Sequence, residues 1–209
     1  MRKIIPTPDV TILCCIPLDE VRWIEASMMR PHGDFVRFIM ERLKASVSDA
    51  WSLFSQEASF VSRKLEDIEA RGIQVVREAT ATDIALATTQ HHNIVLIAHW
   101  KSEELQSDFG LPCLRLETHD AMLTAEEFTD LFPDDFAGTV YMIVCNSTIP
   151  AETFSRQHPQ VICVCSSEPV LAGLSLAKLD AALSLMQIEN IPLWKALLRA
   201  GDLIDSISR

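Results

Sequence analysis

The chain has 209 residues, of which 48% are hydrophobic and 22% charged, a composition typical of a folded protein and not of a disordered one. Acidic residues outnumber basic ones by 29 to 18, so the formal net charge at pH 7 is −11. This charge disfavours sequence-independent binding to nucleic acid or to an anionic membrane, because both depend on clusters of Lys and Arg. It favours a basic peptide or a basic partner surface as the ligand.

The N-terminal segment has a basic start followed by an apolar run from Val10 to Ile16. Pro6 and Pro8 interrupt this segment and no small-residue cleavage site precedes Pro17, so we expect a strand and not a signal peptide. No window approaches the ~18 consecutive apolar residues of a membrane span, and we expect a cytoplasmic protein. The six cysteines are expected to be free thiols, because a chain of this length builds a core without disulfides.

Five short segments rich in Val and Ile are apolar on both faces, which is typical of strands buried in a parallel sheet. These predicted strands are Val10–Ile16, Ile73–Glu78, Asn93–His99, Thr139–Cys145 and Gln160–Cys165.

Segments with helical periodicity separate the predicted strands. A long helix is expected from Asp34 to about Ala70, ended by Gly72. Two further helices are expected from a Thr82-Asp83 cap to Gln90 and from a Thr124–Glu127 capping box to Phe132. Three more are expected to start at a proline: one from Pro150 to before Pro159, one from Pro169 to about Glu189, and one from Pro192 to about Ile207. The alternation predicts an α/β fold: a single doubly wound sheet of mostly parallel strands with helices on both faces, in one domain over residues 1–209.

Doubly wound sheets carry their chemistry at the carboxyl ends of the strands. His99 ends the third predicted strand and Cys145 ends the fourth. A thiol becomes a useful nucleophile when a nearby imidazole takes its proton, so two such residues on neighbouring strand ends indicate nucleophilic catalysis. Read alone, His99 is a strand-end histidine and Cys145 a small buried residue; the pair indicates the chemistry.

The chain resembles the caspase-like cysteine peptidases, and within them the bacterial CHAT-type branch, over about Ile73 to Met186. The resemblance rests on NIVLIAHW (93–100), an apolar strand ending in His, and on TVYMIVCNS (139–147), an apolar strand ending in Cys. It extends through HDAMLTAEEFTDLF (119–132) and QVICVCSSEPV (160–170).

The resemblance implies a caspase-like fold and peptide-bond hydrolysis without a cofactor or metal. It implies that His99 is the general base and acid, that Cys145 is the nucleophile, and that the backbone amides of Cys145 and Trp100 stabilise the oxyanion. The implied partners are a protein substrate, basic at its cleavage site, and an activating or sensor protein, in an effector of bacterial defence or signalling. The candidates for substrate binding are three acidic residues, Glu168, Asp19 and Asp108, and Asn146, which follows the nucleophile.

Two departures from the family pattern leave alternatives open. Trp100 stands where the family usually has Gly and is expected to narrow the approach to the site, and Ser147 stands where a small residue or Gly is common. One alternative is therefore a catalytically inactive, peptidase-like module that binds a partner protein. Another is a flavodoxin-like domain with a phosphate- or flavin-sized site at the strand ends, although the chain has no Gly-rich phosphate loop.

Overall fold

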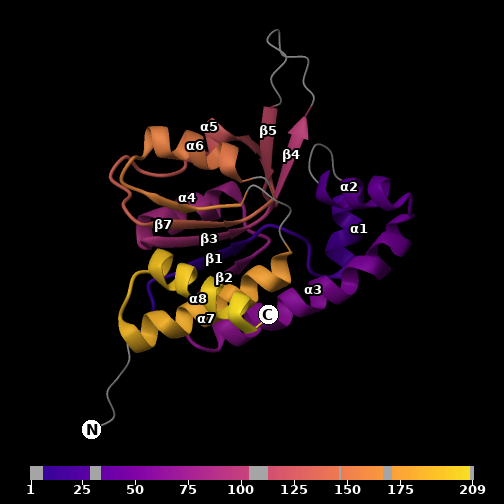
Figure 1. The fold of residues 1–209 in the computed structure, drawn as a ribbon. Coiled ribbons are helices and arrows are strands. Elements are labelled where there is room, and N and C mark those ends of the chain that lie inside the picture. Colours follow the sequence, from indigo (N-terminus) through magenta and orange to yellow (C-terminus); the bar gives the residue numbers. More distant parts are fainter. Residues whose placement is uncertain (1–6, 29–33, 104–112, 146, 167–170, 208–209) are drawn as a thin grey trace.

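A computed structural model of the protein describes residues 7–28, 34–103, 113–145, 147–166 and 171–207 (Figure 1). Its main sheet has five strands in the order β2-β1-β3-β7-β8, and every neighbouring pair is parallel. The strands are β1 (Thr11–Cys14), β2 (Gln74–Arg77), β3 (Asn93–Ile97), β7 (Thr139–Ile143) and β8 (Ile162–Val164). All five predicted strands are confirmed, each shorter than the apolar run that predicts it.

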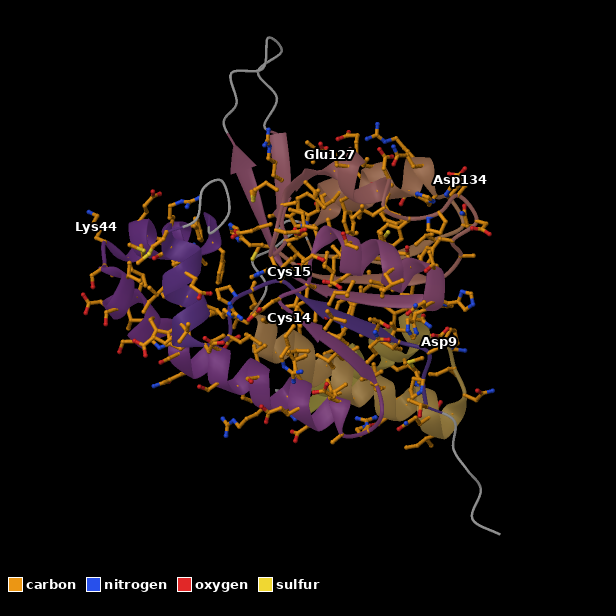
Figure 2. The ribbon with its side chains drawn as sticks, turned by 180° about the vertical axis from the view of Figure 1, so that it is seen from behind. Asp9, Cys14, Cys15, Lys44, Glu127 and Asp134 are labelled. Carbon is orange, nitrogen blue, oxygen red and sulfur yellow. The ribbon has the colours of Figure 1, made fainter. Side chains whose placement is uncertain are left out.

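Helices cover both faces of this sheet, which confirms the predicted α/β class. One face packs on α3 (Val47–Glu69), α7 (Ala172–Glu189) and α8 (Leu193–Ile207), and the other lies under α4 (Ala81–Gln90), α5 (Ala125–Thr129) and α6 (Thr148–Gln157) (Figure 1). Successive residues of a strand point to opposite faces, so each strand supplies both cores. Cys14 lies in the first core and Cys15 in the second, as expected for adjacent strand residues (Figure 2).

A second, antiparallel sheet of three short strands, which the sequence did not predict, follows β3. It consists of β4 (His99–Glu103), β5 (Cys113–Glu117) and β6 (Met122–Thr124), in that order. The Glu117 end of β5 lies near the end of β2, because the His119 N–H donates to the Ala79 carbonyl at 2.9 Å. Strands β4 and β5 carry charged residues among apolar ones, and all three strands lack the Val and Ile runs of the main sheet.

The predicted long helix is wrong, because it is two helices, α2 (Asp34–Leu43) and α3. Lys44 has a φ of 49°, which ends α2, and the Ser46 side chain accepts a hydrogen bond from the Asp49 N–H, which starts α3. An unpredicted helix, α1 (Glu20–Met28), precedes them. These helices share a small core around Trp23, and α1 and α2 lie to one side of the main sheet (Figure 1).

Several predicted helix boundaries are confirmed and one cap is wrong. Helix α8 begins and ends as predicted, Thr124 and Glu127 form the expected capping box of α5, and Gly72 after α3 has a φ of 85°. The N-cap of helix α4 lies two residues earlier than expected, because Thr80 and not Thr82 forms a capping box with Asp83. Pro169, predicted to start a helix, lies outside the described residues, and α7 begins at Ala172. Within the described part of the chain, no helix is both long and apolar enough to cross a membrane.

Candidate active site

The carboxyl ends of β3 and β7 bring His99 and Cys145 to one edge of the main sheet. The two strands are parallel neighbours, with Ile97 paired to Ile143, and each candidate residue lies two positions beyond that pair. Neighbouring strands are about 4.8 Å apart, so the two chain segments leave the sheet at adjacent positions, one before His99 and the other before Cys145. The prediction that they follow neighbouring strands is confirmed, whereas their catalytic roles stay predictions.

His99 does not end β3, as the sequence predicted, but begins β4. After Ile97 the chain leaves the main sheet, and from His99 it pairs antiparallel with β5. The imidazole is half-buried against α2, with ring centroids 5.3 Å from Phe35 and 5.4 Å from Phe38. The histidine is therefore held by two elements that the sequence did not assign to the site.

Cys145 lies in the turn between β7 and α6 and is half-buried. Two residues later, Ser147 is fully buried, and its Oγ accepts a hydrogen bond from the Ser166 N–H at 3.0 Å. The Ser147 N–H in turn donates to the Ser166 carbonyl at 2.9 Å. Ser147 therefore ties the Cys145 turn to the end of β8, which gives this departure from the family pattern a structural reason.

The expectation that the Trp100 indole narrows the approach to the site is wrong. The side chain is only 4% exposed and packs edge-on against Phe128, at a centroid distance of 6.0 Å, inside the second core. Alternation along β4 turns the indole away from the face that carries His99. The predicted role of the Trp100 backbone N–H in the oxyanion hole stays a prediction.

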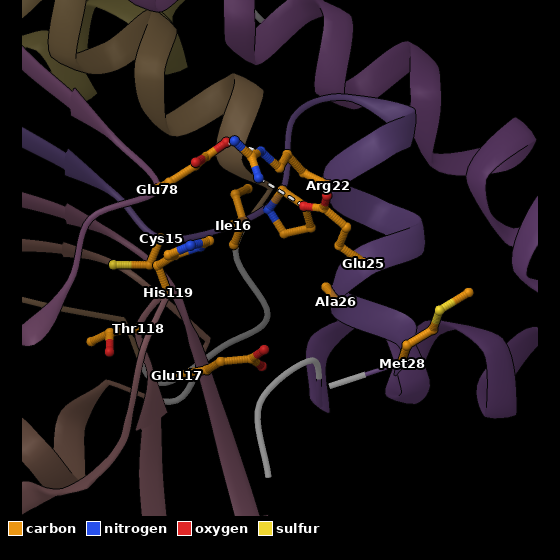
Figure 3. Close-up of a pocket in the computed structure, with 11 residues that line it drawn as sticks. Cys15, Ile16, Arg22, Glu25, Ala26, Met28, Glu78, Glu117, Thr118 and His119 are labelled. Carbon is orange, nitrogen blue, oxygen red and sulfur yellow. Dashed lines mark hydrogen bonds and ion pairs between the residues drawn. The ribbon is translucent and has the colours of Figure 1, made fainter. Parts of the chain in front are cut away.

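A cavity of about 360 Å³ lies at the same edge of the sheet (Figure 3). Neither His99 nor Cys145 lines it, but its wall includes Glu117, the register partner of His99. Its walls are the residues after β1, Glu78 after β2, the end of β5 at Glu117, and one side of α1. The cavity adjoins the end of β3, because the Cys15 N–H donates to the Ile97 carbonyl at 2.8 Å.

Charged side chains from distant parts of the chain meet in this cavity. Arg22 of α1 bridges two carboxylates, at 2.5 Å from Glu78 and 2.7 Å from Glu25 (Figure 3). Glu117 is only 8% exposed and is the third acidic residue of the lining. The lining thus carries three carboxylates and one guanidinium, which makes the cavity anionic and suits a positively charged group.

The cavity also contains a cysteine, but its thiol is not suited to be the nucleophile. Cys15 is buried in the second core, and in Figure 3 its sulfur points away from Arg22 and Glu25. Burial raises the pKa of its thiol, with a smaller contribution from neighbouring acidic groups. Cys15 therefore stays a protonated thiol at neutral pH.

Of the four predicted substrate-binding residues, the structure describes only Asp19. Glu168, Asn146 and Asp108 lie outside the described residues. Asp19 does not line the cavity; its Oδ1 accepts a hydrogen bond from the Arg22 N–H at 2.9 Å, which makes it the N-cap of α1. Its predicted contact with a substrate stays a prediction.

Sequence reasoning missed Glu78, Glu117, Arg22 and Glu25. Glu78 ends a predicted strand, so the rule that selected His99 and Cys145 also points to it. Neither the small sheet nor α1 was predicted, so nothing in the local sequence singled out the other three.

No protein-family model matches the chain, and neither does any of the curated proteins.

Proposed function

We propose that the protein is a cysteine endopeptidase that uses Cys145 as its nucleophile and His99 as its general base and acid. The observation that carries the proposal is the parallel pairing of β3 and β7, which sets both residues two positions beyond the Ile97–Ile143 pair. Thiol catalysis requires a base within hydrogen-bond reach of the nucleophile, and two chain segments that leave neighbouring strands at one edge can supply such a pair. Five described cysteines are free thiols, and Cys145 is the one that follows β7 at this edge.

In the proposed reaction, His99 takes the thiol proton while the Cys145 sulfur attacks the carbonyl carbon of the scissile peptide. The backbone N–H groups of Cys145 and Trp100 stabilise the oxyanion that forms. His99 then gives the proton to the leaving amine, and a thioester remains on Cys145. Water hydrolyses the thioester and restores the thiol.

The resemblance to the caspase-like, CHAT-type peptidases extends this proposal to a biological class. Within that class the protein acts as an effector in bacterial defence or signalling, switched on by a sensor or activating protein. The net charge of −11 and the anionic cavity support a substrate that is basic at its cleavage site. We assign the cavity lined by Glu25, Glu78 and Glu117 to the basic side chain of that substrate.

Removing two of the cavity's carboxylates is expected to reduce its preference for basic substrates. In Glu25→Gln/Glu78→Gln the three carboxylates become one, which the Arg22 guanidinium alone balances. We expect kcat/KM for peptides with Arg before the scissile bond to fall about tenfold, since a charge pair at a partly exposed site is worth on the order of 1 kcal/mol. Fluorogenic peptides that differ only in Arg or norleucine at that residue measure the effect.

The matched control for this pair is Glu126→Gln, an exposed residue in the first turn of α5. It removes a negative charge outside the cavity and is expected to leave the ratio of the Arg and norleucine rates unchanged. An equal ratio in the double variant, the control and the unmodified protein would contradict the assignment of this cavity.

Two other functions compete with the proposal. The strand order β2-β1-β3-β7-β8 is also that of flavodoxin-like domains, which bind phosphate groups at this edge. The three carboxylates of the cavity disfavour a phosphate there. The other competitor is an inactive module that binds a partner protein, and the reactivity of Cys145 separates it from an enzyme.

Cys145 is expected to react with iodoacetamide about tenfold faster than Cys165, the exposed cysteine near the end of β8, because in the proposed mechanism His99 takes the Cys145 proton. Burial, and to a lesser degree Glu152, raises the pKa of Cys165. Burial raises the pKa of Cys163 to about 12, so its thiol stays protonated at pH 8 and reacts slowly. Mass spectrometry of digested protein, sampled over time, gives the rate at each cysteine.

The His99→Ala variant is the decisive comparison in this labelling experiment. The Cys145 rate is expected to fall to that of Cys165, while the rates at the other cysteines stay the same. An unchanged Cys145 rate in His99→Ala contradicts the catalytic pair and favours the interaction module.

A further inference from the structure

Glu117 lies directly opposite His99 in the small sheet. The antiparallel register of β4 and β5 pairs these two residues. Side chains of directly opposed residues stand on the same face of a sheet, with their Cβ atoms about 4.5–5.5 Å apart. The pairing therefore sets the Glu117 carboxylate beside the His99 imidazole, on the same face of the small sheet.

The Glu117 side chain is buried and held in place. It is only 8% exposed, and its Oε2 accepts a hydrogen bond of 2.7 Å from the Phe35 N–H. That N–H belongs to the first turn of α2, where exposed backbone donors and the helix dipole favour a negative charge. A carboxylate offers about four acceptor positions, so this bond leaves capacity for a second donor.

Phe35 joins the two groups. Its backbone bonds Glu117, and its ring packs against the imidazole of His99 at a centroid distance of 5.3 Å. Phe38, one turn further along α2, contacts the same imidazole at 5.4 Å. Both partners of the register pair are thus fixed by the same helix, which restricts the orientations open to the ring.

We propose that Glu117 is a positioning residue that accepts a hydrogen bond from the His99 imidazole and so directs its other nitrogen toward Cys145. This inference rests on the proposed function. A carboxylate that accepts a hydrogen bond from the imidazole nitrogen that does not face the thiol selects one tautomer of the ring. It also stabilises the imidazolium that forms when the thiol proton is transferred. The site then contains a carboxylate, an imidazole and a thiol in sequence, drawn from β5, β4 and the turn after β7.

Other charged or titratable groups surround His99. On the elements packed against it they are Arg115 of β5 and Arg37, Glu41 and Arg42 of α2. The adjoining cavity adds Arg22, Glu25, Glu78 and His119. The same elements also carry Asp34, Lys101, Glu103 and Cys113, whose side chains are outside the described ones. Arg42 lies over the ring of Phe38, at 5.9 Å from its centroid. Among all these groups Glu117 is the acidic one that the register sets opposite His99.

The Glu117→Gln variant tests the proposal, because it keeps the shape and an acceptor for the Phe35 N–H but removes the charge. We expect the pH at which His99 is half protonated to fall by about one pH unit, since the imidazolium loses a carboxylate partner. The NMR signals of the six histidines, with His99 identified by its loss in His99→Gln, measure this midpoint. The limb of the kcat/KM profile that His99 governs is expected to shift to lower pH by the same amount.

The control is Glu41→Gln, which removes the same charge from an exposed position on α2 and is expected to leave the midpoint in place. Equal midpoints in Glu117→Gln and Glu41→Gln overturn the proposal. If the Gln variant does not fold, Glu117→Asp withdraws the carboxylate by one methylene, and its midpoint is expected to lie below that of the unmodified protein. An unchanged midpoint in Glu117→Asp then overturns the proposal.

The NMR readout does not require peptidase activity, so the two proposals fail separately. A lowered His99 midpoint in a protein that cleaves no peptide refutes the proposed function and keeps the Glu117–His99 bond. If the protein cleaves peptides but Glu117→Gln changes neither the His99 midpoint nor the pH profile of kcat/KM, the proposed function stands and the positioning role is refuted.

Discussion

Replacing Cys145 with Ala is expected to reduce kcat/KM for peptide hydrolysis by about a thousandfold or more. Cys15, the described thiol beside the end of β3, is buried and stays protonated at neutral pH, so it is not expected to replace Cys145 as the nucleophile. Loss of the nucleophile in a thiol or serine peptidase leaves only the contribution of substrate binding and the oxyanion hole. A pool of fluorogenic peptides with Arg or Lys before the scissile bond provides the assay.

The matched control for this variant is Cys165→Ala, which removes an exposed thiol after the neighbouring strand β8 and is expected to keep full activity. Cys145 is half-buried in a turn, so its truncation is expected to change the free energy of unfolding by less than about 1 kcal/mol. Denaturant unfolding of both variants checks this. Undiminished cleavage by a folded Cys145→Ala protein would refute the proposed mechanism.

Replacing Gly138 with Ala is expected to destabilise the protein by about 3 kcal/mol. A Cβ atom at this position would lie 1.7 Å from the His92 carbonyl oxygen, which is backbone and cannot rotate away. The same carbonyl accepts a hydrogen bond of 3.0 Å from the Thr139 N–H, the contact that starts the pairing of β3 and β7. Any shift that relieves the clash therefore displaces β3 and β7, the two strands that precede His99 and Cys145.

The control for this prediction is Gly201→Ala, within helix α8. The added Cβ would lie 3.2 Å from the Lys178 Nζ, the mobile end of a flexible side chain. Ala is favoured over Gly inside helices by about 1 kcal/mol, so this variant is expected to be neutral or slightly stabilising. Chemical denaturation followed by circular dichroism measures both variants, and equal midpoints of unfolding would contradict the role of the close approach at Gly138.

The local sequence predicts the main sheet well. Each of its five strands contributes apolar side chains, mostly Val and Ile, to both cores, a pattern that few other structures fit. It predicts helix ends with similar success where a capping residue marks them, as at Thr124 and Gly72. It fails at Lys44, because the amphipathic pattern continues across the break between α2 and α3.

The candidate site divides in the same way. His99 and Cys145 are chemically distinctive and follow strongly patterned strands, so a rule about strand ends selects them. Glu117 ends a short strand of the unpredicted small sheet, and Arg22 lies on an unpredicted helix. Both are ordinary charged residues until the fold brings them to the same edge.

Taken alone, the amino-acid sequence determines the parallel α/β sheet and selects His99 and Cys145 as the candidate pair, because both depend on periodicity and residue type within short windows. The tertiary structure alone decides that β4 pairs with β5, that Glu117 lies opposite His99, and that α1 closes an anionic cavity beside them. Those arrangements join residues as far apart as Arg22 and Glu117. They depend on how packed elements meet, and no local pattern in the chain encodes that.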